Sequence, residues 1–361
     1  MAEEERQCLL TITMFAWFLL PLILASFANA SPGDRDPLYS SCVEHCARTG
    51  CVGRSCFSVC NVPINGGGAL GVDGEEVLKK PLDLGLFSWD CTRECRYQCM
   101  LHREAERQSH GLEPVKYHGK WPFDRILGLQ EPASVVFSLL NLLAHILGVV
   151  SFLVLLYHKL PLRQHGKGVP YYEYAGLWTI YALFAINSWF WSAIFHARDM
   201  NVTERLDYCS AVALIGLSLI LAIIRTGNLR VEAARVMASA PIIAFISTHI
   251  LYLNFYEFDY GLNMKVCIVM GVLQLLLWSL WAAYTQHPAR LKLWIVVLGG
   301  ALAMLLEVYD FPPYKGIFDA HSIWHAVTVP LTYLWWSFIR DDALYRTMDL
   351  FNRGKIAKKV E

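Results

Sequence analysis

Three histidines and a serine stand at the ends of long apolar segments, at spacings that suit metal chemistry. Ser192 lies four residues before His196, and His321 lies four residues before His325. On helices, residues with this spacing share one face. Ionisable side chains within membrane segments are costly and usually functional. Three histidine ligands with an open fourth position form the ligand set of a catalytic zinc ion. The sequence therefore predicts a membrane-embedded, zinc-dependent hydrolase with His196, His321 and His325 as metal ligands.

Asp207 and Ser192 are the candidate catalytic residues beside these ligands. An aspartate near a helix N-terminus commonly caps the helix, but Asp207 begins an apolar segment at the depth of the histidines. We interpret Asp207 as a general base or as a partner of a ligand. Ser192 could allow close helix packing, or could donate to an oxyanion one turn from His196. A serine–histidine–aspartate triad would leave the second histidine pair unexplained, so zinc is favoured, although imidazole also accepts iron or copper.

The other polar residues of the apolar segments receive a structural interpretation. We expect His145 and His249 to be hydrogen-bonded to neighbours and His158 to lie at a loop. Four acids are expected to be solvated in luminal loops, namely Asp199, Glu307, Asp310 and Asp319.

The composition is that of a membrane protein. Hydrophobic residues make up 55% of the 361 residues and charged residues only 17%, which fits a polytopic membrane protein better than a soluble globule. The formal net charge is zero, so nothing indicates a nucleic-acid partner. Apolar segments of about 20 residues, enough to cross a bilayer as a helix, recur from residue 134 onward. We place seven transmembrane helices, at 134–157, 171–196, 207–225, 237–256, 265–285, 291–309 and 318–338. The predicted fold is all-α and polytopic, with residues 131–340 forming the hydrolase domain.

The orientation follows from two independent patterns. The apolar core at 9–26 ends in Ala28-Asn29-Ala30, which is typical of a signal peptide over residues 1–30. Three glutamates before this core are atypical, so an uncleaved anchor is the alternative. Either one carries residues 31–130 into the secretory lumen. The expected cytosolic loops hold most of the basic residues, in agreement with the positive-inside rule: Lys159, Arg163, Lys167, Arg225, Arg230, Arg235, Arg290 and Lys292. The tail, 341–361, is then cytosolic.

The luminal segment 31–130 is rich in cysteine. Eight of the eleven cysteines fall between Cys42 and Cys99. An even number in an oxidising compartment predicts four disulfides, with the connectivity open. The spacing of Cys51, Cys56 and Cys60 could also bind a metal, but the preceding leader favours disulfides.

Two short motifs bear on processing and location. The sequon Asn201-Val-Thr203 is expected to be unmodified or poorly modified, because it lies only a few residues from two span ends. Lys358 and Lys359 resemble a dilysine retrieval signal, which predicts residence in the endoplasmic reticulum membrane with cycling through the early Golgi.

The pattern formed by Ser192 with His196, by Asp207 and by His321 with His325 resembles the signature of the CREST superfamily. This superfamily of seven-helix membrane proteins includes alkaline ceramidases and the progestin and adipoQ receptors. Within it, the chain from about Ser31 to Asp342 is most similar to the post-GPI-attachment-to-proteins factors, the Per1-like family that remodels GPI lipids. The local sequence of the chain, for example Tyr172-Glu-Tyr174, resembles that of a plant member of this family. The motifs that carry the family resemblance are Lys120-Trp-Pro-Phe123, Gln130-Glu-Pro-Ala-Ser134, Asn187-Ser-Trp-Phe-Trp-Ser192, Phe258-Asp-Tyr-Gly261, Asp310-Phe-Pro-Pro313 and Asp319-Ala-His321.

The resemblance implies a zinc held by the three histidines and removal of the sn-2 acyl chain from GPI-anchored proteins. The leading hypothesis is therefore an ester hydrolase acting on GPI lipid, a phospholipase A2-like activity. One alternative is an amidase acting on ceramide with the same metal centre. A second is a non-enzymatic seven-helix receptor or escort for GPI-anchored proteins, with a structural zinc.

Overall fold

The computed structural model describes residues 31–60, 89–161 and 171–360, with side chains through residue 352. The predicted leader at 1–30 lies outside the described residues. The polar N-terminal part contains η1 (Pro32–Arg35), α2 (Pro37–Thr49), β1 (Cys51–Val52), β2 (Ser55–Cys56) and α3 (Cys91–Ser109). The longer helices that follow are α4 (Pro132–Lys159), α5 (Ala175–Ala197), α6 (Asn201–Thr226), α7 (Glu232–Phe255), α8 (Tyr260–Tyr284), α9 (Arg290–Tyr309) and α10 (Ala320–Val360).

The chain divides into two compact units. Among the described residues, one unit comprises 31–60, 89–131 and Phe311–Asp319, and the other comprises Pro132–Asp310 and α10. The segment 311–319, which joins α9 to α10, therefore belongs with the N-terminal residues. Its attachment includes a backbone hydrogen bond of 2.9 Å from Asp124 N to the carbonyl oxygen of Gly316.

Disulfides hold the N-terminal unit together. Helix α2 begins where the Asp36 side chain accepts a hydrogen bond from Leu38 N, and it ends at Gly50, whose φ of 72° suits glycine. Two disulfides, Cys42–Cys99 and Cys46–Cys95, join α2 to α3. The Cys51–Cys56 disulfide closes the β1–β2 hairpin, and the Cys60–Cys91 disulfide joins the residues after β2 to the start of α3. The prediction of four disulfides is confirmed. The proximity of Cys60, Cys91 and Cys95 reflects these bridges, because disulfide sulfurs are not thiolate ligands.

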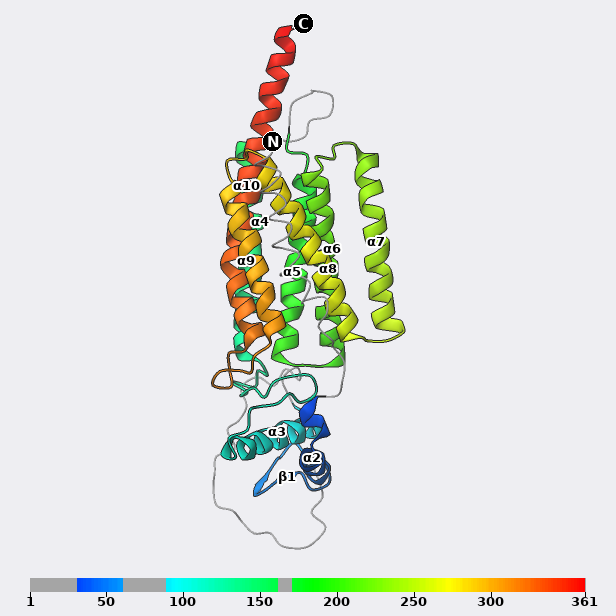
Figure 1. Cartoon of the computed structure of the whole chain (residues 1–361), viewed down its shortest axis with the longest axis vertical. Helices are drawn as coiled ribbons and strands as arrows, with labels where there is room; N and C mark the ends of the chain where they lie inside the picture. Colours follow the sequence, from blue (N-terminus) through cyan, green and yellow to red (C-terminus); the bar gives the residue numbers. More distant parts are fainter. Residues whose placement is uncertain (1–30, 61–88, 162–170, 361) are drawn as a thin grey trace, which may run out of the picture. The chain divides into compact units, whose positions relative to one another are not determined.

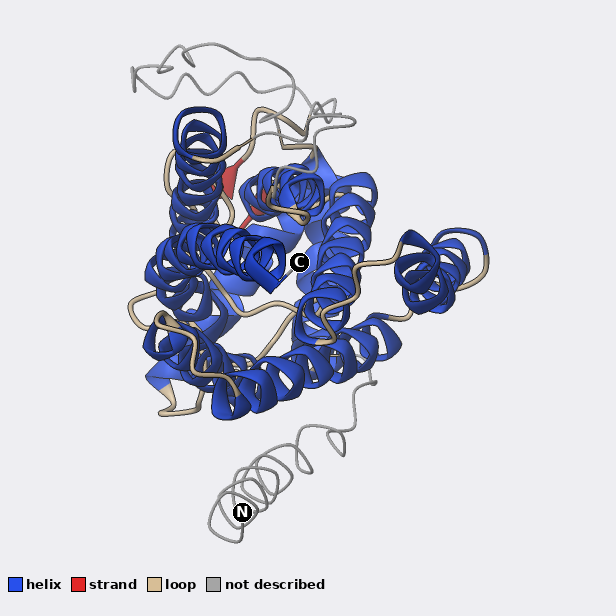
Figure 2. Ribbon diagram, turned by 90° about the horizontal axis from the view of Figure 1, so that it is seen from above, coloured by secondary structure: helices blue, strands red, loops and turns tan. Residues whose placement is uncertain are grey.

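Helices α4 to α10 form a bundle (Figure 1). Helix α4 packs against α5 and α10, α10 against α9, and α6 against α5, α7 and α8. Small residues permit the close approaches that membrane helices use. A Cβ atom at Gly148 would lie 2.2 Å from the Trp336 ring, so this glycine lets α4 meet α10. Helix α7 stands at the edge of the bundle, at the right of Figure 2.

Among the described residues, six helices, α4 to α9, have the length and apolar character of a membrane span. Each overlaps one of the first six predicted spans. The seventh predicted span, 318–338, falls within α10, a helix of 41 residues that packs against α4 and α9. Its first half carries two histidines, three tryptophans and Pro330, and these residues lower its mean hydropathy below that of the other six helices. A seventh span stays a prediction.

Candidate functional site

The predicted metal ligands come from two helices that meet at one end of the bundle. His196 is the penultimate residue of α5, and His321 is the second residue of α10. His325 follows one turn further along α10. The helices bring the histidines together because i, i+4 spacing places His321 and His325 on one face of α10, and that face is turned toward the end of α5.

The three imidazoles converge through their Nε2 atoms. The Nε2 atom of His321 lies 3.3 Å from that of His196 and 2.9 Å from that of His325. In a tetrahedral zinc site with Zn–N distances of about 2.0–2.1 Å, ligand nitrogens lie roughly 3.3 Å apart. Three imidazole nitrogens at this separation repel one another through their lone pairs unless a proton or a cation lies between them. The residues therefore fit a metal ion with imidazole-type ligands.

The opposite ring nitrogens of His321 and His325 are held by neighbouring helices. Glu307 on α9 places Oε2 2.6 Å from His321 Nδ1, and Ser138 on α4 places Oγ 3.4 Å from His325 Nδ1. A histidine that donates Nδ1–H to an outer acceptor presents the lone pair of Nε2 to a metal. The expectation that Glu307 is a solvated loop acid is therefore wrong. It lies in the last turn of α9, and its side chain is only 20% exposed.

Ser192 belongs to the same hydrogen-bonded group. Its Oγ lies 3.1 Å from Ser138 Oγ, so Ser138 connects Ser192 to His325. Asn141, one turn further along α4, donates to the backbone carbonyl of His325 over 2.8 Å. Sequence reasoning missed Ser138 and Asn141. The signal for them was their spacing, about one helical turn, in a mostly apolar segment that also carries His145.

Asp207 lies in the second turn of α6 and is buried. It does not cap the helix, because Thr203 Oγ1 accepts the hydrogen bond from Met200 N at the start of α6. At about 1.5 Å per residue, Asp207 is roughly 9 Å from the start of α6, and Ser192 is roughly 8 Å from the end of α5. Because α5 and α6 are consecutive packed helices, the two residues share a depth. Their catalytic roles stay predictions.

Tryptophans shield the histidine cluster. The Trp189 ring lies 5.2 Å from that of His325, and Trp324 stacks on Trp189 and lies 5.4 Å from His321. His196 and His325 are both buried, whereas the His321 side chain is 33% exposed. The cluster thus has one accessible side, at His321.

Two of the remaining histidines are hydrogen-bonded to neighbours as expected, whereas His158 lies in the last turn of α4 rather than at a loop. His145 accepts a hydrogen bond of 3.1 Å from Trp336 Nε1, and His249 Nε2 lies 3.1 Å from Asn263 Oδ1. Among the acids expected to be solvated, Asp319 is buried, so that expectation is wrong for this residue too.

Comparisons with known proteins identify the family. The Per1-like family pattern matches residues 81–343. A zebrafish (Danio rerio) protein named GPI-specific phospholipase A2-like PGAP3 is 36% identical over 341 residues, covering 94% of this chain and 98% of the relative. The human protein (Homo sapiens) of the same name is 33% identical over 334 residues, covering 92% and 95%. A fission yeast (Schizosaccharomyces pombe) protein named PER1 homolog is 33% identical over 339 residues, covering 90% and 92%. The chain belongs to the Per1-like family.

Proposed function

We propose that this chain removes the sn-2 acyl chain from the lipid of GPI-anchored proteins by zinc-dependent ester hydrolysis. The observation that carries the proposal is the convergence of three imidazole Nε2 atoms at one end of a membrane bundle. The animal relatives are named GPI-specific phospholipase A2-like, which supports the substrate class. A role in GPI-anchor remodelling follows from the family, and the bond cleaved and the metal are the further proposal.

In this proposal His196, His321 and His325 hold the zinc. A zinc ion bound there would polarise an ester carbonyl and would lower the pKa of a bound water toward neutrality. Glu307 orients His321 by accepting its Nδ1 proton, and Ser138 does the same for His325. These two contacts fix both rings before substrate arrives, so no reorganisation is needed during the reaction.

Ser192 and Asp207 would act on the ester and on the proton. Ser192 Oγ lies one helical turn from His196 and donates to the oxyanion that forms at the carbonyl. Asp207, at the same depth on α6, accepts the proton released by the attacking water. Trp189 and Trp324 cover the histidines and keep bulk water away, which strengthens these electrostatic contacts.

The location of the site suits an ester in a membrane lipid. The histidines lie at helix ends rather than mid-bundle, and the ester groups of a lipid also lie near the membrane surface. We place this end in the secretory lumen, because the unit with four disulfides requires an oxidising compartment. Residence in the endoplasmic reticulum and Golgi membranes, behind a signal peptide and with a cytosolic tail, is part of the proposal. Microscopy of a tagged full-length chain tests it.

Lipid mass analysis of GPI anchors tests the activity. Cells lacking the protein are complemented with the native chain, with His321→Ala or with His158→Ala, a matched control at the other end of α4. We expect the native chain and the control to restore remodelled anchors, and His321→Ala to leave the original sn-2 chain in place. If His321→Ala restores remodelling at equal protein level, the proposed active site is wrong.

A further inference from the structure

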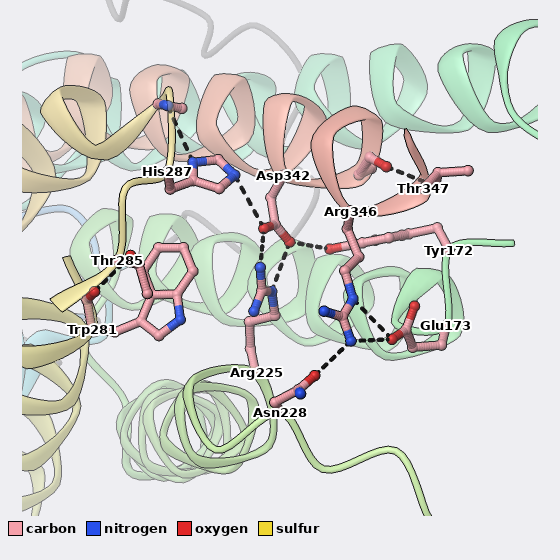
Figure 3. Close-up of polar contacts among 12 residues, drawn as sticks. Tyr172, Glu173, Arg225, Asn228, Trp281, Thr285, His287, Asp342, Arg346 and Thr347 are labelled. Carbon is pink, nitrogen blue, oxygen red and sulfur yellow. Dashed lines mark hydrogen bonds and ion pairs between the residues drawn. The ribbon is translucent and has the colours of Figure 1, made fainter. Parts of the chain in front are cut away.

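A second polar group lies at the opposite end of the bundle from the histidines. Asp342 follows His321 by 21 residues on α10, which corresponds to about 30 Å along the helix. Around it gather residues from α6, α10 and the connections before α5 and between α8 and α9 (Figure 3). Nothing in the proposed hydrolysis uses them.

Two ion pairs organise this group. The Nε and Nη2 atoms of Arg225 both bond to the Asp342 carboxylate, which is 1% exposed. Arg346 places Nε and Nη2 3.1 and 2.9 Å from Glu173 Oε1. Tyr172 donates to Asp342 over 2.7 Å. Burial raises the pKa of the Tyr172 hydroxyl, so this proton stays in place at neutral pH.

Each guanidinium group keeps an unused edge. In the part of the chain that the structure describes, the Nη1 atoms of Arg225 and Arg346 make no hydrogen bond. Arginine forms its strongest contacts through its planar fork with carboxylate or phosphate. These edges are therefore available to a further anion.

Both arginines line one cavity of about 520 Å³. This volume falls within the range of small-molecule sites, about 300–1,000 Å³. The charged lining consists of the two arginines and one acid, Asp349. His287 also lines the cavity, and burial lowers its pKa, so it adds no charge at neutral pH. Among the described residues, the lining side chains therefore carry two positive charges and one negative charge, and the acids that pair with the arginines, Asp342 and Glu173, lie outside the lining.

The aromatic lining of the cavity suits the surface of a membrane. Trp281, Tyr284 and Tyr345 line it beside the arginines, and tryptophan and tyrosine are enriched where membranes meet water. Trp281 and Tyr284 lie in the last turn of α8, one of the six membrane-span helices. The cavity therefore lies at the level of lipid headgroups.

We propose that this cavity binds a phosphate group through the Nη1 edges of Arg225 and Arg346, with a phospholipid headgroup as the principal source. A free phosphate offers the same chemistry, and the test separates the two. The site lies in the bundle far from the histidines, so the proposal does not depend on the proposed hydrolysis.

Binding to the purified full-length chain in detergent tests the proposal. The probes are dioctanoyl phosphatidylinositol, dioctanoyl phosphatidylcholine and inorganic phosphate, followed by native mass spectrometry. We expect phosphatidylinositol to bind and phosphatidylcholine to bind much more weakly, because its headgroup carries no net charge. Binding of inorganic phosphate as well would assign a general phosphate site. Failure of both phosphatidylinositol and inorganic phosphate to bind would overturn the proposal.

Paired substitutions test the residues while keeping charge balanced. Arg346→Gln/Glu173→Gln removes a whole ion pair, so neither charge is left buried alone, and we expect affinity to fall at least about tenfold. Glu173→Gln alone leaves the cation without its competing acid, so affinity should rise.

The matched control is Lys292→Gln/Asp341→Asn. This pair, 2.6 Å apart, lies at the same end of the bundle but does not line the cavity. It should leave binding unchanged. Equal affinity in the native chain and in Arg346→Gln/Glu173→Gln, with the same melting temperature, would refute the arginine site.

Discussion

Replacing Glu307 by alanine should weaken metal binding by the histidine cluster about tenfold. Its Oε2 atom lies 2.6 Å from His321 Nδ1. A hydrogen bond to a charged group contributes roughly 1.5–3 kcal/mol, and each 1.4 kcal/mol is about a tenfold change in affinity. The His321 side chain is 33% exposed, so water replaces part of the lost contact, and the lower end of this range applies. Loss of such an outer partner typically costs about 10- to 100-fold in metal affinity.

Glu307→Gln separates charge from geometry. Its amide oxygen can still accept the Nδ1 proton of His321, so the ring keeps the tautomer that presents Nε2. The negative charge that raises ligand basicity is lost. We therefore expect affinity to fall in the order native, Glu307→Gln, Glu307→Ala, with the glutamine variant within a few-fold of native.

The assay is competition between the zinc-loaded full-length chain in detergent and a chelator of known affinity, with metal content measured by mass spectrometry. It requires no substrate and does not depend on catalysis. Glu257→Ala is the control, since Glu257 is an exposed glutamate between α7 and α8 at the same end of the bundle. Identical chelator curves for the native chain and Glu307→Ala would show that this carboxylate does not support a metal ligand.

Three further outcomes are expected. Ser192→Ala should lower GPI-lipid remodelling about 100- to 1,000-fold with the protein level unchanged. Ser138→Ala should lower it less, because Ser138 acts through hydrogen bonds rather than on the ester. Equal remodelling in both variants and the native chain would contradict these roles. Cys46→Ser/Cys95→Ser should destabilise the N-terminal unit by about 2–5 kcal/mol, measured as faster proteolysis of the full chain, and unchanged proteolysis would count against this. Asn201→Gln should leave electrophoretic mobility unchanged, because the threonine of that sequon is buried and bonded at the start of α6; a faster-migrating band would show that the site is glycosylated.

The membrane helices could be predicted because their signal is local. Apolar runs of about 20 residues follow directly from bilayer thickness, and the ends of α4 to α9 differ from the predicted spans by only a few residues at most boundaries. The largest difference is at α6, which begins at Asn201 rather than 207. The first turn of α6 is polar, but Thr203 Oγ1 accepts a hydrogen bond from Met200 N, which stabilises the earlier start of the helix.

The number of disulfides could be predicted from composition, but their pairing could not. Cys42 and Cys46 lie one turn apart on α2, and Cys95 and Cys99 lie one turn apart on α3. This spacing predicts that each pair shares a helix face. Whether the facing helices run parallel or antiparallel decides which cysteines meet, and only the tertiary structure contains that information. The observed pairs, Cys42–Cys99 and Cys46–Cys95, are those of an antiparallel arrangement.

The site was predictable only within single helices. The i, i+4 rule finds His321 with His325 because both lie on one helix. Glu307 and Ser138 reach the same histidines from α9 and α4, and no spacing in the sequence relates one helix to another. The sequence alone therefore leaves Glu307 as a solvated acid of a luminal loop. Its hydrogen bond to His321 depends on the packing of α9 against α10.

The charged residues at the other end of the bundle show that the positive-inside rule can misinterpret the basic residues of a binding site. Arg225 was counted among the loop cations that set orientation, yet it is buried and paired with Asp342. A cation held inside the bundle by an acid reports packing, whereas an exposed cation reports the side of the membrane. Arg230 and Arg290 are exposed and lie at the same end as Arg225, so the orientation rests on residues such as these. A buried, paired arginine should therefore not be counted when the orientation is predicted. Like other ionisable residues in membrane helices, it is instead a candidate for a binding site.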